Sequence, residues 1–76
     1  MNTFRSRGHH DIVASDCIEA ARIFAMRTIS KIEKPDHLTV TMLRNSGGTS
    51  THIATAILGK DNPPTMMTLQ FYVTEL

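Results

Sequence analysis

The sequence predicts an α+β domain in which one amphipathic helix packs on a roughly four-stranded antiparallel sheet, in the order β-α-β-β-β. A capping signal at residues 14–16 precedes an apolar pattern with helical spacing, whereas residues 38–43 alternate apolar side chains with threonine, as half-buried strands do. Glycine and proline separate the later strands. A chain of 76 residues has room for one hydrophobic core, so we expect a single domain over residues 1–76.

The first element expected is one strand somewhere within residues 3–13, since the segments on both sides of Gly8 can be extended. Gly8 itself suits a bend or a β-bulge, because glycine adopts backbone conformations that other residues avoid. This strand would lead directly into the helix.

The helix is expected over residues 16–32. Asp16 and Glu19 have the spacing of a capping box, with Ser15 as a rival cap, and Pro35 disfavours helical geometry just beyond the end. Apolar side chains recur at three- and four-residue spacing and predict a stripe that faces the sheet, made of Cys17, Ile18, Ala21, Phe24, Ala25, Thr28, Ile29 and Ile32.

Three strands are expected over residues 38–43, 51–58 and 65–75, separated by a long mobile loop at 44–50 and a turn at 59–64. Side chains on a strand alternate between its two faces. We assign to the face beneath the helix Leu38, Val40, Met42, Ile53, Ile57, Met67, Leu69, Phe71 and Val73. The opposite face would carry Thr39, Thr41, Leu43, His52, Ala54, Leu58, Met66, Thr68, Gln70 and Tyr72.

Charge and cysteine content narrow the classes of function. Eight Lys and Arg against seven Asp and Glu give a formal net charge of +1, which by itself creates no field that recruits nucleic acid. Cys17 is the only cysteine, so a disulfide within the chain is excluded and a reducing, cytoplasmic location is expected. No apolar run approaches the roughly 20 residues of a membrane span.

Histidines next to an aspartate are the first candidates for metal chemistry, because imidazoles and carboxylates are common ligands. His9, His10 and Asp11 are adjacent, but neighbouring side chains on a strand point to opposite faces. His37 and His52 lack the spacing that would complete a site. We therefore expect no bound metal.

Two further motifs are weighed against simpler interpretations. Cys17 lies in the first turn of the helix, where the helix dipole activates thiols, but it also belongs to the apolar stripe and is interpreted as a small core residue. Residues 44–49 resemble a phosphate-binding loop, yet they connect two strands and lack its Gly-Lys-Ser/Thr ending. We expect neither a catalytic residue nor a cofactor.

The outer face of the helix is the best candidate binding surface, because it places two apolar side chains between two arginines. Arginine and methionine are enriched at protein interfaces. The predicted partner-binding residues are Arg22, Ile23, Met26 and Arg27, with Arg5 and Arg7 as an electrostatic flank.

The sheet face away from the helix is the second candidate, because nothing in a chain with one helix covers it. We expect Leu58, Met66 and Tyr72 to be buried there against a second copy of the chain, so that a homodimer is favoured over a monomer. A Thr-rich face exposed to solvent is the alternative.

The passage from Ile12 to Ala25, a strand running into a capped helix that precedes a meander, resembles the layout of small phage and mobile-element accessory proteins, among them anti-CRISPR proteins. The resemblance implies a non-enzymatic inhibitor that binds a host protein complex stoichiometrically in the host cytoplasm. Anti-CRISPR proteins are often acidic, and this chain is not.

Two other classes of function remain open from the residues. A helix on a three-stranded sheet also serves nucleic-acid binding, although Tyr72 has no aromatic companion on the sheet for stacking bases. An enzyme has the least support.

Overall fold

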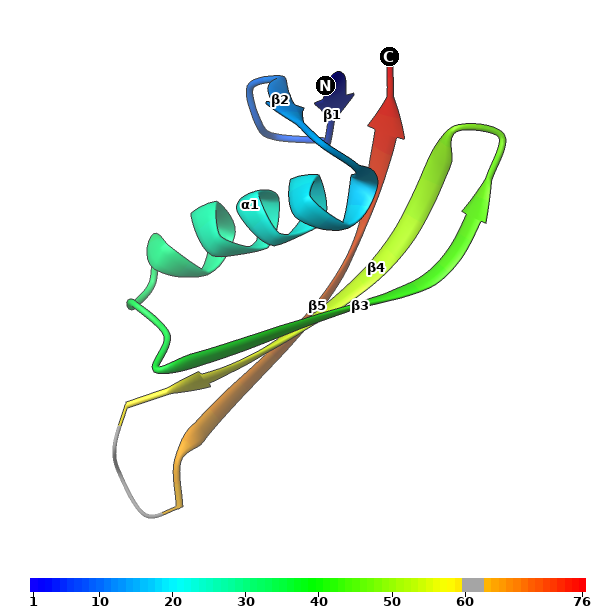
Figure 1. The fold of residues 1–76 in the computed structure, drawn as a ribbon. Coiled ribbons are helices and arrows are strands. Elements are labelled where there is room, and N and C mark those ends of the chain that lie inside the picture. The colour runs from blue at the N-terminus through cyan, green and yellow to red at the C-terminus, as the bar shows by residue number, and fades with distance from the viewer. Residues whose placement is uncertain (60–62) are drawn as a thin grey trace.

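A computed structural model of the chain, which describes residues 1–59 and 63–76, contains one helix on an antiparallel sheet (Figure 1). The elements are β1 (Asn2–Arg5), β2 (Ile12–Ala14), α1 (Cys17–Ser30), β3 (His37–Ser46), β4 (Thr49–Leu58) and β5 (Thr65–Glu75). The five strands lie in the order β2-β1-β5-β4-β3. The predicted α+β class and single helix are confirmed, and the sheet has one strand more than expected.

The extra strand comes from the N-terminal segment, where one strand was expected and two are present. β1 pairs on one side with β2, with Asn2 opposite Ala14, and on the other with the end of β5, with Phe4 opposite Glu75. Between β1 and β2 the chain turns at Gly8, whose φ of 85° favours glycine. The glycine is therefore the turn of a short hairpin rather than a bulge within one strand.

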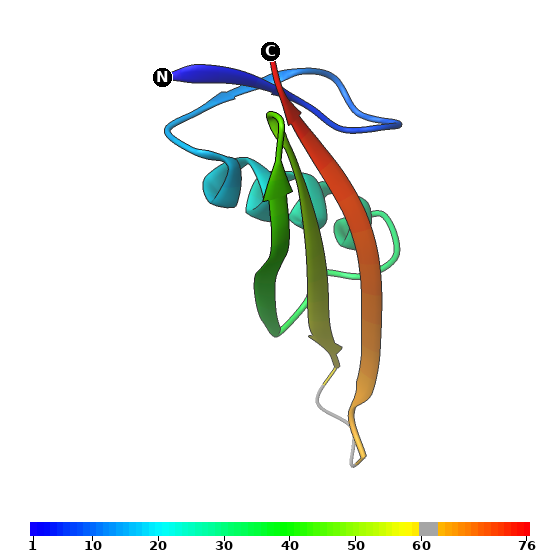
Figure 2. The ribbon, with the colours of Figure 1, turned by 90° about the vertical axis from the view of Figure 1, so that its right-hand side faces the viewer.

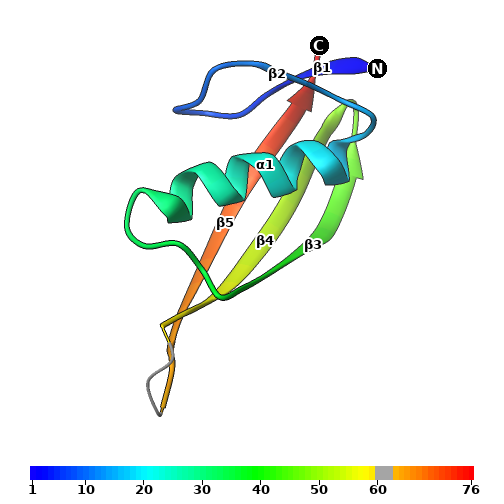
Figure 3. The ribbon, with the colours of Figure 1, turned by 60° about the vertical axis from the view of Figure 1, so that its left-hand side comes forward.

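The helix begins where the capping signal predicts. The Asp16 side chain accepts a hydrogen bond from the Glu19 backbone N–H at 2.8 Å, and the Ser15 hydroxyl donates to the Glu19 carboxylate at 2.6 Å. The helix crosses β5, β4 and β3 (Figure 3) and buries Ala20, Ala21, Phe24, Ala25 and Ile29. Two residues assigned to the buried stripe are exposed, since Ile18 and Ile32 retain 52% and 66% of their accessible surface.

The face assigned to β4 is wrong. Its buried residues are Ser50, His52, Ala54, Ala56 and Leu58, whereas Ile53 and Ile57 lie on the opposite face. Ala54 and Ala56 form one core cluster with Ala25 and Ile29 of the helix. Small side chains on both elements allow the helix to approach the sheet closely, and this close packing outweighs the greater hydrophobicity of isoleucine.

The loop expected at 44–50 is also wrong, because the strands continue through most of it. Ser46 pairs with Thr49, which leaves Gly47 and Gly48 as a two-residue turn. Both glycines have positive φ, at 59° and 84°, as a type I′ hairpin turn requires. The register shifts between Met42 and Arg44, where a bulge interrupts β3. Three of the residues in the second predicted turn, 60–62, lie outside the described residues.

The sheet has the helix on one face only. Figure 2 presents the opposite face, over which no element lies in the described part of the chain. We call this surface the open face, and it carries His37, Thr39, Thr41, Thr51, Ile53, Thr55, Ile57, Met66, Thr68, Gln70 and Tyr72. Within the described ranges, no helix is both long and apolar enough to cross a membrane.

Candidate interaction surfaces

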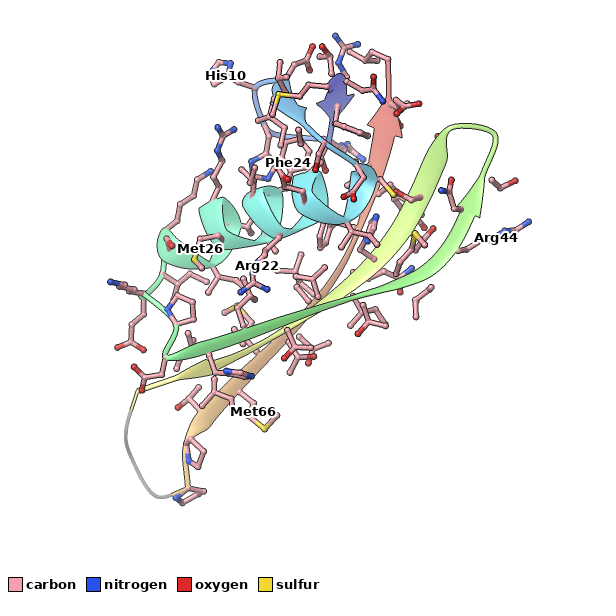
Figure 4. All side chains as sticks on the ribbon, viewed as in Figure 1. His10, Arg22, Phe24, Met26, Arg44 and Met66 are labelled. Atoms are coloured by element: carbon pink, nitrogen blue, oxygen red, sulfur yellow. The ribbon has the colours of Figure 1, made fainter. Side chains whose placement is uncertain are left out.

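The outer side of the helix carries the four residues predicted there. Arg22, Ile23, Met26 and Arg27 line a shallow hollow of about 310 Å³, which we call the helix surface (Figure 4). Both arginines are exposed and Met26 is 38% exposed. Arginine beside apolar carbon is a composition typical of protein interfaces.

Ile23 differs from the prediction, because it is only partly exposed. Its side chain packs against the core cluster that contains Ile12, Ala20 and Phe24. A polar replacement at position 23 would therefore disturb the core as well as the helix surface. Met26 and the two arginines are the positions that test binding separately from folding.

Arg5 and Arg7 do not join the helix surface. They lie on the N-terminal hairpin and line a separate hollow of about 700 Å³ with Gln70, Phe71 and Tyr72 of β5. Arg5 makes a bidentate ion pair with Asp11, with both N–O distances at 2.9 Å. This hydrogen bonding holds the pKa of the Asp11 carboxyl below its usual range.

His9 attaches the tip of the N-terminal hairpin to the helix. Its Nε2 lies 3.0 Å from the Thr28 hydroxyl, and its ring centroid lies 5.2 Å from that of Phe24. Partial burial lowers the pKa of His9, and the neighbouring charges of Lys31 and Arg27 lower it further. The imidazole is therefore used in a structural contact with the helix.

Next to His9 is a third hollow, of about 620 Å³, between the hairpin tip and the C-terminal half of the helix. Gly8, His9, His10, Arg27 and Lys31 line it. His10 is exposed at the tip of the hairpin (Figure 4). No group of three or more His, Cys, Asp or Glu side chains within residues 1–59 and 63–76 could hold a metal ion.

Sequence reasoning missed a buried polar pair beneath the helix. The Nε2 of His52 lies 2.7 Å from the Ser50 hydroxyl, which in turn donates to the Val73 carbonyl at 3.4 Å. The His52 ring stacks on Phe71, and among the described residues its Nδ1 has no hydrogen-bond partner. Burial lowers the pKa of His52. The expectation that His52 lies on the outward sheet face is wrong.

Cys17 is half-buried and its sulfur lies 3.8 Å from the sulfur of Met42. This contact fits its interpretation as a small residue at the edge of the core.

The open face also differs in composition from the prediction. Met66 and Tyr72 lie on it, as expected, and are 62% and 59% exposed in the single chain, but Leu58 is buried on the helix side. Ile53 and Ile57 take its place. Met66 lies at the start of β5 and points away from the helix (Figure 4).

Comparisons with models of protein families, with curated proteins and with solved structures find no match to this chain.

Proposed function

We propose that this protein is a small, non-enzymatic binding module that acts by stoichiometric contact with another protein, and that the helix surface is the contact. The observation that carries the proposal is the position of Met26 between Arg22 and Arg27 on the solvent side of the helix. Met26 supplies apolar area, and the arginines supply planar, multidentate donors for carboxylates of a partner.

The helix is a suitable platform for such a contact because it is firmly held. Its inner residues Phe24, Ala25 and Ile29 are at most 1% exposed, and the Asp16 cap fixes its first turn. A rigid helix backbone loses little further order when a partner binds, so the ordering cost is confined to the side chains. The backbone positions of residues 22, 26 and 27 are therefore fixed before the encounter.

A second surface supports self-association. Ile53, Ile57 and Met66 place apolar side chains among threonines on the open face. A second copy would cover the part of this face around Ile57 and Met66, at the end of β5 away from Tyr72, and add apolar burial to a chain of 76 residues. We therefore propose a homodimer that leaves both helices outward for partners.

The resemblance in layout to anti-CRISPR proteins gives the partner a proposed class, a protein complex of host defence against foreign DNA. In a host with active CRISPR immunity, expression of the protein is expected to restore plaque formation by a phage that this immunity targets. An unchanged plaque count would reject this class of partner and leave the helix surface as a contact for another protein.

The helix surface itself is tested with a double variant, Arg22→Glu with Met26→Glu. Tagged parent protein is used to capture partners from the native host, and the captured protein is purified and titrated by calorimetry. The variant is expected to bind at least tenfold more weakly, since it reverses one charge and removes the apolar centre. Circular dichroism should show that the variant is folded, because Arg22 is exposed and Met26 belongs to neither core cluster.

The matched control is Ile32→Glu with Lys34→Glu, which makes the same types of change at two exposed positions beyond the end of the helix. This control should bind like the parent. Equal affinity of the Arg22 and Met26 double variant and the parent would refute the helix surface as the contact.

A further inference from the structure

The N-terminal hairpin forms a ridge between two of the hollows described above. Gly8 and His9 line both hollows. Arg27 and Lys31 of the helix complete the lining of one hollow, and Arg7 and residues of β5 line the other. The two hollows are therefore a continuous surface that passes over the hairpin tip. We infer that this surface, here called the basic ridge, binds single-stranded nucleic acid through its phosphates.

The charges of the basic ridge are of one sign. Arg5, Arg7, Arg27 and Lys31 line it, and no Asp or Glu belongs to the described lining of either hollow. Arg5 is the one ridge cation held in an ion pair in the part of the chain that the structure describes. The other cations are available to phosphates, and neutralising phosphates releases counterions, which drives binding. A net charge of +1 for the chain conceals this local concentration.

The ridge is fixed in place by contacts on both of its sides. On the helix side, His9 contacts Thr28 at 3.0 Å and packs on Phe24. On the sheet side, the Ser6 hydroxyl donates to the Tyr72 carbonyl at 2.7 Å. At its base, the Arg5 and Asp11 ion pair joins the two ends of the loop. The backbone of the hairpin that carries Arg7 is therefore fixed against the helix that carries Arg27 and Lys31.

An aromatic side chain distinguishes a nucleic acid from an acidic protein as the ligand. Tyr72 is 59% exposed and lines the same hollow as Arg7. An exposed ring beside cations is the arrangement by which proteins stack an unpaired base while holding its phosphate. Bases within a duplex are already stacked and cannot occupy such a ring, so the ligand is single-stranded.

The test uses the whole chain and fluorescein-labelled oligothymidylate of about 12 nucleotides, with binding followed by anisotropy from about 20 to 200 mM salt. Parent protein is expected to bind saturably, with a dissociation constant that rises with salt. The double variant Arg7→Ala with Lys31→Ala should weaken binding roughly tenfold or more at low salt. It should also reduce the slope of log K against log salt by about 1.4, for two lost phosphate contacts.

Lys34→Ala with Arg44→Ala is the control, because it removes the same charge from exposed positions outside both the ridge and the helix surface. It should keep the parental slope. Tyr72→Leu should weaken binding about fivefold or more, whereas Tyr72→Phe should bind like the parent. Circular dichroism of each variant checks that it is folded.

Three results would overturn the inference. The first is the absence of saturable binding to the oligonucleotide at the lowest salt. The second is an equal loss for the ridge variant and the Lys34 and Arg44 control, which would indicate a response to net charge alone. The third is equal or tighter binding of a 12-base-pair duplex or of polyglutamate, which would assign the ridge to duplexes or to acidic proteins.

Discussion

His52 is a polar, titratable residue in a fully buried environment. Its side chain is fully buried, with the hydrogen bond to Ser50 on one nitrogen and Phe71 against the ring. A protonated imidazole has two N–H donors, and the Nδ1 proton would have no acceptor among the described residues. The folded protein therefore holds His52 neutral, and burial lowers its pKa.

This burial predicts loss of stability in mild acid. The unfolded chain titrates its histidines near pH 6.5, whereas the folded protein resists protonation of His52 until a lower pH. The free energy of unfolding is therefore full above about pH 6.5 and falls as the pH drops, by at most about 1.4 kcal/mol per pH unit for one histidine. Chemical denaturation between pH 7.5 and 5 measures the slope.

His52→Gln is expected to flatten this slope, because glutamine keeps a polar group near Ser50 and does not titrate. A residual slope should remain from His9, whose pKa is also lowered. The control His37→Gln, at an exposed position on β3, should keep the parental slope. If the free energy of unfolding of His52→Gln and of the parent falls equally as the pH is lowered, another group causes the loss of stability in acid.

The position of His52 also shows what pattern reasoning at single residues can predict. On β5 the alternation of apolar and polar side chains identifies Phe71 and Val73 as inward-facing, because polarity and facing coincide there. On β4 the two sets are Ile53 with Ile57 against His52 with the alanines, and hydrophobicity alone selects the wrong set. The deciding quantity is the distance between helix and sheet, which depends on side chains of two elements at once.

At the scale of elements, the helix is the part of the fold with the strongest local determinants. Its cap joins Asp16 to the Glu19 N–H, and Ser15 holds the Glu19 carboxylate. Asp16→Ala is expected to lower the free energy of unfolding by roughly 1 kcal/mol, because it leaves an N–H of the first turn without its side-chain acceptor. Urea denaturation monitored by circular dichroism measures this loss.

Asp16→Ser is the matched variant, since serine also caps helices and should recover most of the lost stability. Asp36→Ala removes the same carboxyl at an exposed position outside the helix and should change stability by less than about 0.5 kcal/mol. Equal stability of Asp16→Ala and the parent would show that Ser15 alone can cap the helix.

The N-terminal hairpin was less predictable than the helix, because its pairing is with the other end of the chain. Phe4 lies opposite Glu75, and the Leu76 N–H donates to the Thr3 carbonyl at 2.9 Å. Nothing in the local pattern of residues 1–14 indicates that β5 completes this part of the sheet. The residues of the helix surface could be predicted together because they lie on one face of a single helix. The placement of Arg7 beside Tyr72, and of His9 against the helix, depends on this long-range pairing.

At the scale of the whole molecule, the five-stranded sheet has one face over which none of the described residues forms a covering element (Figure 2). On this face Ile57 of β4 pairs with Met66 of β5, and Ile53 lies on the same face of β4. These three side chains give the open face an apolar part on the side of the sheet away from the helix. The proposed dimer predicts that this part is covered in solution.

Light scattering of the parent at about 200 μM is therefore expected to give twice the mass of the 8.5 kDa chain, and the melting temperature should rise with concentration. The double variant Ile57→Lys with Met66→Lys should be monomeric, and its melting temperature should not depend on concentration. The substitutions remove the apolar contact, and the lysines of the two copies repel one another. The variant Ile18→Lys with Ile32→Lys adds the same charges at exposed positions on or just beyond the helix and should remain dimeric.

A monomeric parent at this concentration would exclude the dimer. Dissociation of the dimer by the Ile18 and Ile32 variant, with the Ile57 and Met66 variant unaffected, would move the interface from the sheet to the helix.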